Sequence, residues 1–203
     1  MNEHEEIEKS IIVSLMKSAL ASGEIDTSGL TEEEVEAKCM EHLKRLADSE
    51  EEWEFIIDHR PDLIKQAKDH FESGQYELST VLYAMWLEHW INGIYHQICY
   101  RKGLSNSDYK EMIRSLNMRA KTGWFLKMLD LPPLDNEMLK IFNKVIESRN
   151  SFVHYKWQPQ GELSREERLE SERDSLEEID TLIGYLVEYE TDNVFYGYQL
   201  ERV

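Results

Sequence analysis

The chain has 203 residues, of which 41% are hydrophobic, enough to build a sizeable core. No apolar run reaches the roughly 18 residues that a membrane-spanning helix needs, and the acidic N-terminus is unlike a signal or transit peptide, so we expect a cytoplasmic protein that contacts no membrane. The formal net charge of -18 argues against a nucleic-acid-binding surface over the whole chain. Cys39 and Cys99 flank no second pair of metal ligands, so we expect buried, reduced thiols rather than a zinc site or a disulfide.

The first 60 residues are predicted to form an acidic helical extension. An amphipathic helix is expected near Glu3 to Ala21, and the segment from Gly23 to Gly29 ends it. Thr31-Glu32-Glu33-Glu34 has the form of a capping box, which predicts a second helix toward Arg60, interrupted near Ser49. The extension carries 17 acidic and 6 basic side chains. We interpret it as an accessory layer, or as an arm for dimerisation or partner binding.

Residues 61–203 are predicted to form an all-α, up-and-down helical bundle. A short helix from Pro61 to Phe71 leads to a break at Gly74. The next helix, Tyr76 to Tyr100, is apolar nearly all round, so we expect it to be the central buried helix. No strand-like alternation, internal repeat or glycine-rich phosphate loop occurs, so nucleotide-binding folds of the Rossmann and P-loop types are not expected.

One polar line interrupts the apolar surface of this central helix. Glu88, Asn92 and His96 recur at positions i, i+4 and i+8, which places them on one face. Buried polar groups need hydrogen-bonding partners, so the line predicts a polar contact in the bundle interior or at its rim. In the alternative, Glu88 points to solvent, and His89 and His96 are hydrogen-bonded histidines of the core or the surface.

Shorter helical pieces follow, and they begin the only basic segment of the chain. A turn at Gly103 and at Ser105 to Ser107 precedes helices predicted at Asp108 to Leu116 and Arg119 to Asp130. Residues 101–160 hold 6 acidic and 11 basic side chains, the latter being Arg101, Lys102, Lys110, Arg114, Arg119, Lys121, Lys127, Lys140, Lys144, Arg149 and Lys156. This charge either forms a solvated face that balances the acidic ends or faces RNA.

The helix predicted from Asp135 to Trp157 carries the most informative motif. Asp135 is a candidate N-cap, and Pro159 and Gly161 end the helix. Arg149 falls near the middle of its apolar stripe, which comprises Met138, Ile141, Phe142, Val145, Ile146, Phe152, Val153 and Trp157. A guanidinium keeps its charge, so an arginine there demands a carboxylate, an anionic ligand or a wet interface. We therefore expect Glu88 or its neighbours to face Arg149.

A polar strip runs along the edge of the same helix and completes the motif. It comprises Asn143, Glu147, Asn150 and His154. The run Arg149-Asn150-x-x-x-His154 resembles the signature of the HEPN superfamily, an arginine, a small polar residue and, after four to six intervening residues, a histidine. The resemblance covers about two thirds of the chain and implies a HEPN-like bundle, a homodimer with a joint active site, and RNA cleavage that needs no metal or other cofactor.

The residue types suit that chemistry. Attack of an RNA 2'-hydroxyl on its own phosphate requires removal of a proton and stabilisation of extra negative charge on phosphorus, which a histidine and an arginine can supply. By resemblance, Arg149 would stabilise the phosphate, His154 would be the general acid or base, and Asn150 would orient the substrate or the histidine. We add Lys156 and Glu88 as candidate binding or orienting residues. Arg149 and His154 diverge by about 140° on a regular helix, so two copies could form one cleft.

The resemblance also indicates a biological role, with one departure. HEPN proteins of this type commonly act as toxins, abortive-infection factors or other antiviral effectors, which implies an RNA substrate and a cognate antitoxin or regulatory protein. Some of these toxins have a tyrosine two residues after the histidine, which a partner nucleotidyltransferase modifies. Here Lys156 occupies that place and Tyr155 adjoins His154, so this route of silencing is not expected.

Two other function classes remain open. The first is a non-catalytic HEPN-like binding module, or an acidic protein that binds a partner as an antitoxin or nucleic-acid mimic. The second is an all-helical, magnesium-dependent nucleotide pyrophosphatase with paired acidic motifs. Its candidate pairs are Glu33 and Glu36, Glu51 and Glu54, Glu167 and Glu170, and Glu177 and Asp180. The last helix, predicted from Ser164 to about Glu190, carries two of these pairs; its start is charged and its later part is amphipathic.

Overall fold

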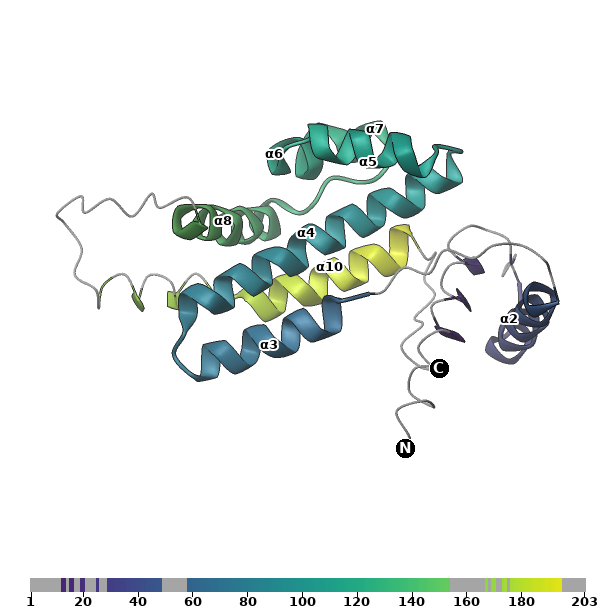
Figure 1. Cartoon of the computed structure of the whole chain (residues 1–203), viewed down its shortest axis with the longest axis horizontal. Coiled ribbons are helices and arrows are strands. Elements are labelled where there is room, and N and C mark those ends of the chain that lie inside the picture. Colours follow the sequence, from purple (N-terminus) through teal and green to yellow (C-terminus); the bar gives the residue numbers. More distant parts are fainter. Residues whose placement is uncertain are drawn as a thin grey trace.

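The computed structural model describes residues 29–48, 58–153 and 176–194, together with residues 12, 13, 15, 16, 19, 20, 25, 167, 169, 170, 173 and 174. Every element within these residues is helical (Figure 1), which confirms the predicted all-α bundle. The helices are α2 (Glu32–Ala47), α3 (Arg60–Glu72), α4 (Tyr76–Arg101), α5 (Asn106–Ser115), α6 (Met118–Ala120), η1 (Lys121–Phe125), α7 (Leu126–Met128), α8 (Asn136–Val153) and α10 (Ile179–Asn193). None of the described helices has the length and apolar character needed to cross a membrane.

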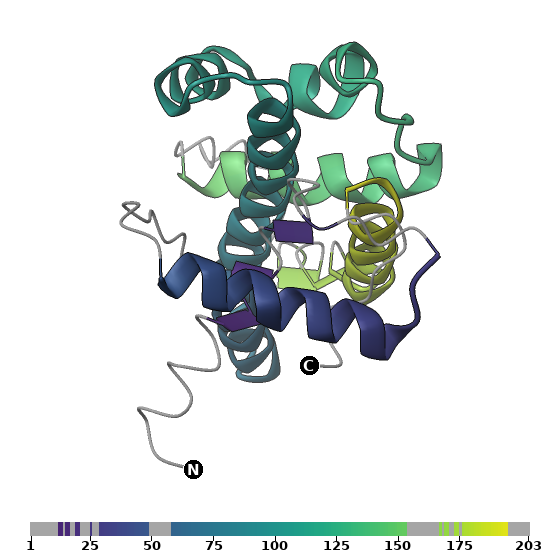
Figure 2. The ribbon, with the colours of Figure 1, turned by 90° about the vertical axis from the view of Figure 1, so that its right-hand side faces the viewer.

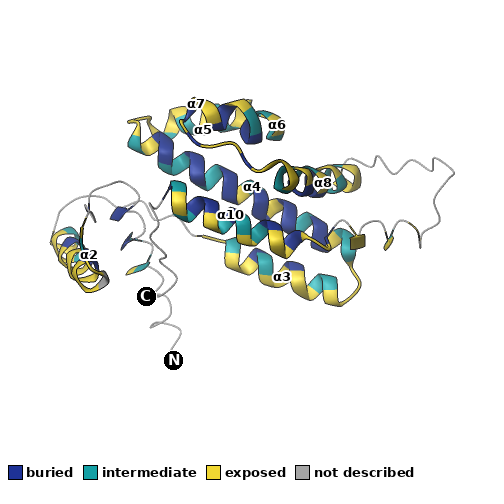
Figure 3. Ribbon diagram, turned by 180° about the vertical axis from the view of Figure 1, so that it is seen from behind, coloured by how far each residue is buried: buried dark blue, intermediate teal, exposed yellow. Residues whose placement is uncertain are grey.

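The central helix is α4, as predicted. It is buried along most of its length (Figure 3), because apolar residues cover nearly its whole circumference. In Figure 1, α5, α6 and α7 lie above α4, whereas α3 lies below it. Gly74, with φ of 71°, makes the turn between α3 and α4 in a conformation that favours glycine. The hydroxyl of Ser79 then donates to the carbonyl of Ala67 at 2.8 Å, which joins the two helices.

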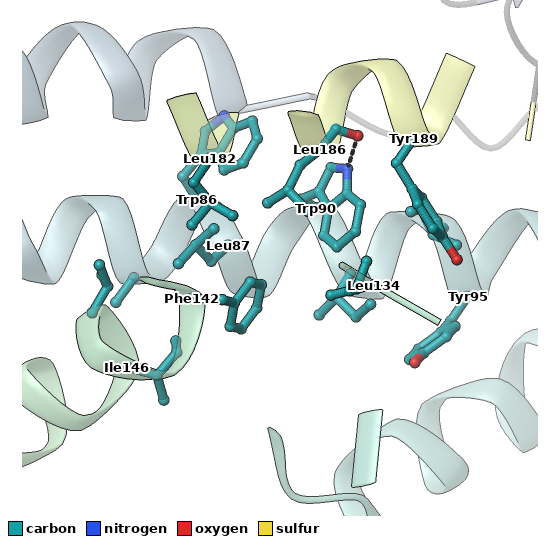
Figure 4. Packing of buried hydrophobic residues seen from close by; sticks show 14 of the residues in the cluster. Trp86, Leu87, Trp90, Tyr95, Leu134, Phe142, Ile146, Leu182, Leu186 and Tyr189 are labelled. Carbon is teal, nitrogen blue, oxygen red and sulfur yellow. Dashed lines mark hydrogen bonds between the residues drawn. The ribbon is translucent and has the colours of Figure 1, made fainter. Parts of the chain in front are cut away.

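Aromatic side chains link α4 to α10, and α10 to the corner before α8. The indole Nε1 of Trp90 donates to the carbonyl of Leu186 at 3.0 Å, inside the apolar cluster that Figure 4 shows. The Tyr189 hydroxyl donates to the carbonyl of Pro132 at 2.6 Å. The indole N–H of Trp90 and the hydroxyl of Tyr189 thus both donate to backbone carbonyls, so neither polar group is left without a hydrogen bond in the core.

The start and the buried face of α8 agree with the sequence. The Asp135 carboxylate accepts from the backbone N–H groups of Glu137 at 2.8 Å and Met138 at 3.2 Å, which confirms the predicted N-cap. The helix buries Ile141, Phe142, Val145 and Ile146. Phe152 and Val153 were also predicted in the apolar stripe, but they are 42% and 43% exposed. The apolar stripe thus extends along α8 beyond the part that is buried.

Two predicted helices are broken. Residues 119–130 form no single helix: α6 passes into the π-helix η1, where Gly123 has φ of -113° and ψ of -110°. The long helix expected from Ser164 to Glu190 is interrupted by a turn at residues 176–178. The N–H of Ile179 bonds to the carbonyl of Leu176, and both side chains are buried. Helix α10 itself runs on to Asn193, beyond the end expected near Glu190.

The N-terminal region has a hydrophobic cluster of its own. Helix α2 lies at one end of the bundle (Figures 1 and 2), and its cluster is separate from the bundle core. The predicted capping box is confirmed, because Thr31 and Glu34 bond each other's backbone N–H groups. The helix ends at Ala47, well short of Arg60, and the segment between lies partly outside the described residues. The division at residue 60 stays a prediction. Cys39 and Cys99 are buried free thiols, as expected.

Buried tyrosines give a prediction about alkaline stability. Tyr83 is 3% exposed, and burial, with the nearby charge of Asp180, raises its pKa to about 12. The unfolded chain loses this proton near pH 10, whereas the folded chain keeps it. The free energy of unfolding should therefore fall as the pH rises from about 10 to about 12.

Denaturant unfolding between pH 8 and pH 11 tests this expectation. Tyr83→Phe removes the ionisable hydroxyl. Above pH 10 the free energy of unfolding of this variant should therefore fall less steeply than that of wild type, with slopes that differ by up to about 1.4 kcal/mol per pH unit. Tyr100→Phe is the matched control, since its side chain is 57% exposed, and it should retain the wild-type slope. Equal slopes in wild type and Tyr83→Phe would contradict the prediction.

Candidate functional site

Arg149 lies where α8 packs on α4, and its guanidinium has two partners. Its Nη2 is 3.5 Å from Oε1 of Glu88, and its Nη1 donates to Oδ1 of Asn150 at 2.9 Å. The Arg149 side chain is 24% exposed and that of Glu88 is 35% exposed. The expectation that Glu88 faces Arg149 is thus confirmed, and the alternative in which Glu88 only meets solvent is wrong. The arginine sits at the rim of the bundle, held from two sides.

One donor of this guanidinium has no partner. Within the described part of the chain, the Nε atom of Arg149 and the Nε1 atom of Trp86 are buried and make no hydrogen bond. A buried unsatisfied donor costs about 1–3 kcal/mol. The contact with Glu88, at 3.5 Å, is also longer than the 2.7–2.9 Å of a strong charge-assisted bond. The buried Nε cannot itself reach a ligand, but the side chain is 24% exposed and only loosely paired with Glu88, so the exposed part of the guanidinium can take a further acceptor.

A buried lysine adds a second cation beside Glu88. The Nζ of Lys121 donates to Oδ1 of Asn92 at 2.8 Å, and the residue is only 7% exposed. Burial lowers the pKa of Lys121, and the charge of Glu88 partly opposes that effect. The sequence placed Lys121 in the basic segment as a candidate for a charged surface; this was wrong, because η1 turns the side chain toward α4. Glu88 is thus shared electrostatically between Lys121 and Arg149.

The third residue of the polar line contacts α5. The rings of His96 and Tyr109 pack edge to face with centroids 5.0 Å apart. The Tyr109 hydroxyl donates to the backbone carbonyl of Asn92 at 2.9 Å. The three residues of the polar line therefore contact three different elements. Glu88 pairs with Arg149 of α8, Asn92 accepts from Lys121 of η1, and His96 packs on Tyr109 of α5. The sequence indicated the polar line but not its partners beyond Arg149.

The remaining predicted site residues divide between described and undescribed positions. His154 and Lys156 lie outside the described residues, as does Tyr155. Asn150 was predicted to orient the substrate or the histidine. Its side-chain oxygen accepts from Arg149 at 2.9 Å, so it helps to hold the guanidinium, and its role toward the substrate or the histidine stays a prediction. The catalytic roles of Arg149 and His154 stay predictions.

A cavity of about 490 Å³ opens beside this cluster, and sequence reasoning missed it. It lies between the α6–η1 segment and the first half of α8 and is lined by Asn117, Arg119, Ala120, Thr122, Gly123, Trp124, Leu139 and Asn143. Asn143 had been assigned to the polar strip of α8 that leads to Asn150. For the other lining residues, the only signal in the sequence was the Gly123-Trp124 pair, which lies in a predicted helix that also carries Arg119 and Lys121.

Several cations of the basic segment already have partners within the chain. Lys102 pairs with Asp130 at 3.1 Å, Lys140 pairs with Glu137 at 2.7 Å, and the Nζ of Lys144 donates to the carbonyl of Asp174 at 3.1 Å. Exposed cations of α5, α6 and α7 include Lys110, Arg114, Arg119 and Lys127. Positive charge therefore remains exposed on α5, α6 and α7, whereas Lys102 and Lys140 are paired with acids.

The acidic pairs considered for a pyrophosphatase are dispersed. Glu33 and Glu36 are exposed on α2, and the pairs Glu167 with Glu170 and Glu177 with Asp180 are exposed near α10. Glu51 and Glu54 lie outside the described residues. Among the residues that the structure describes, no three His, Cys, Asp or Glu side chains are grouped so that they could hold a metal ion.

Comparison with protein-family models, with curated protein sequences and with solved structures finds no match for this chain. Its family is therefore not shown by similarity, and the resemblance to the HEPN signature rests on the sequence motif Arg149-Asn150-x-x-x-His154 and on the order of the helices.

Proposed function

We propose that the protein is a metal-independent endoribonuclease of HEPN type in which Arg149 stabilises the reacting phosphate. The observation that carries this proposal is the guanidinium itself. It lies at the rim of the bundle with its side chain 24% exposed, and it is held by Glu88 and Asn150 without a short charge-assisted bond to the carboxylate. The two Nη groups of an arginine placed in this way can bind two charged phosphate oxygens. Because the guanidinium is already held in position, it needs no reorganisation when negative charge develops in the transition state.

The charge around Arg149 also supports an anionic substrate. Glu88 is the carboxylate that interacts with both Lys121 and Arg149, so two cations share one acid. A phosphodiester placed there would supply the second negative charge. In this proposal His154 acts as the general acid or base, Asn150 positions Arg149, and Lys156 contacts the RNA backbone. Two copies of the chain bring their α8 helices together to complete the site, and the expected biological role is that of a toxin or antiviral effector in the cytoplasm, controlled by an antitoxin or another regulatory protein.

A cleavage assay on mixed RNA with EDTA present tests the proposal. Wild type should cleave, and His154→Ala should lower the rate by about 10² to 10⁴, the usual contribution of a general acid or base. Added magnesium should not restore or increase the rate. Activity that vanishes in EDTA would favour the pyrophosphatase or another metal enzyme instead.

A second candidate function is a non-catalytic binding module. The exposed acids of α2 and the net charge of -18 favour it, because a strongly acidic surface suits a basic protein partner more than RNA. A folded dimer that cleaves no RNA, and whose biological effect survives His154→Ala, would move the assignment to this class.

A further inference from the structure

The cavity between α6–η1 and α8 lies outside the contacts of Arg149 and has the size of a ligand site. Its volume of about 490 Å³ falls within the 300–1,000 Å³ typical of small-molecule pockets. The residues that line it include an aromatic, a cation, an apolar residue and two amides, namely Trp124, Arg119, Leu139, Asn117 and Asn143. Few ligand classes use an aromatic plane, a cation and two amides together.

The backbone at this wall is unusual and firmly anchored. Segment η1 is kinked, because Gly123, with φ of -113° and ψ of -110°, leaves helical geometry altogether. Lys121 is tied to Asn92, and the Tyr95 hydroxyl donates to the carbonyl of Lys121. Phe125, at the end of η1, is 1% exposed. The segment is thus fixed to the core at both ends.

This anchored segment presents Trp124 to solvent. The indole is 55% exposed, although both residues that flank the Gly123–Trp124 pair are buried. Its ring packs edge to face on Phe125, with centroids 5.6 Å apart, which leaves a ring face for another partner. A rigidly held, exposed tryptophan at a cavity wall is a stacking platform.

The polar groups of the cavity suit the edge of a base. The side-chain oxygen of Asn117 caps α6 by accepting from Ala120, so its NH₂ group is the part left to donate. Asn143 makes no side-chain hydrogen bond within the described part of the chain, so both its donor and its acceptor are available. Arg119 is exposed and can meet a phosphate at the mouth. Stacking, amide pairing and a phosphate contact together are the recognition chemistry of an unstacked nucleotide.

We propose that this cavity binds one unstacked nucleobase of a single-stranded RNA, with the ring on Trp124 and its edge on Asn117 and Asn143. The inference rests on the proposed function, because it places the base on the strand that Arg149 holds. Asn143 and Asn150 are seven residues apart, hence on one face of α8 and about 10 Å apart along its axis. Asn150 in turn accepts from the guanidinium of Arg149 at 2.9 Å, so a strand lying along this face would reach both the cavity and the guanidinium.

The nucleobase subsite can be tested separately from cleavage by measuring how the protein binds an RNA analogue that it cannot cleave. Fluorescently labelled, short 2'-O-methyl oligoadenylate and oligouridylate lack the attacking hydroxyl, so their affinity can be measured by anisotropy with the intact dimer. Trp124→Ala should weaken binding of at least one of them about tenfold, whereas Trp124→Phe, which keeps a stacking ring, should lose about threefold or less. Tyr100→Ala is the matched control, because this aromatic is 57% exposed and does not line the cavity; it should bind as wild type does.

The outcomes separate the subsite from the nuclease. Unchanged affinity in Trp124→Ala, or no binding of either strand by wild type, would overturn the subsite. AMP that binds as tightly as the strands and also depends on Trp124 would overturn the assignment to RNA and indicate a free nucleotide. Binding that depends on Trp124 in a protein that never cleaves RNA would support the subsite and remove the nuclease. Thermal unfolding of each variant, followed by circular dichroism, confirms that it is folded.

Discussion

Arg149→Ala should lower the rate of RNA cleavage by about 10³-fold while the protein stays folded. Loss of a preorganised group that stabilises developing charge typically costs 10² to 10³ in rate. The stability effect should be small, because the Arg149–Glu88 pair is partly exposed and loose, and such pairs contribute about 1 kcal/mol or less. Single-turnover cleavage of a defined RNA, paired with thermal unfolding, separates the two effects.

Two further variants sharpen this expectation. Arg149→Lys keeps the charge but not the planar fork, so it should recover only a small part of the lost rate. Arg114→Ala removes an exposed arginine of α5 and serves as the control for a general loss of positive charge. If Arg149→Lys cleaved at the wild-type rate, or Arg114→Ala fell as far as Arg149→Ala, Arg149 would not be the residue that recognises the phosphate.

Glu88→Gln should slow cleavage by on the order of 10²-fold, although Glu88 itself touches no substrate in the proposed site. The carboxylate fixes the guanidinium and balances Lys121, and misplacement of a catalytic group by about 1 Å can cost that much. Since the glutamine keeps the shape of the side chain, the fold should persist. Glu88 is thus expected to be a positioning residue, and the loss should appear in the rate of the chemical step rather than in RNA affinity.

A double variant with Glu88→Gln and Arg149→Ala tests whether Glu88 acts by positioning Arg149 or only by stabilising the fold. In an Arg149→Ala background, Glu88→Gln should have little further effect, because the group it positions is gone. Glu77→Gln, three turns earlier on α4, is the matched control and should cleave at the wild-type rate. Additive losses in the double variant, or full activity and stability in Glu88→Gln, would rule out this function of the ion pair.

The features predicted well from sequence are those set by local periodicity. The apolar circumference of the Tyr76 to Tyr100 segment predicted a buried α4, and the break at Gly74 followed from its freedom to take positive φ. Arg149 in an apolar stripe and Glu88 in a polar line each needed a partner, and that shared need was enough to predict their contact. This argument used only helix geometry and the cost of burying charge.

The features that sequence reasoning missed depend on packing between distant segments. Nothing local to Lys121 shows that Asn92, 29 residues earlier, would accept a hydrogen bond from its Nζ in a buried position. The π-helix and the departure at Gly123 arise where Tyr95 and Asn92 fix the backbone and side chain of the same residue. The turn at Leu176 likewise places two buried side chains in the core. Periodicity alone predicts continuous helices in both regions.

The chemistry of the new RNA ends is the most direct test of the central claim, that Arg149 stabilises a phosphate attacked by the neighbouring 2'-hydroxyl. RNA digested by wild type in EDTA should carry 2',3'-cyclic phosphates, and the same sites should remain intact with Arg149→Ala. A substrate with a single 2'-deoxynucleotide before the mapped cut should resist wild type there. Cleavage of that deoxy-substituted bond, or ends with a free 3'-hydroxyl, would contradict the account, because the 2'-hydroxyl would then not be the nucleophile.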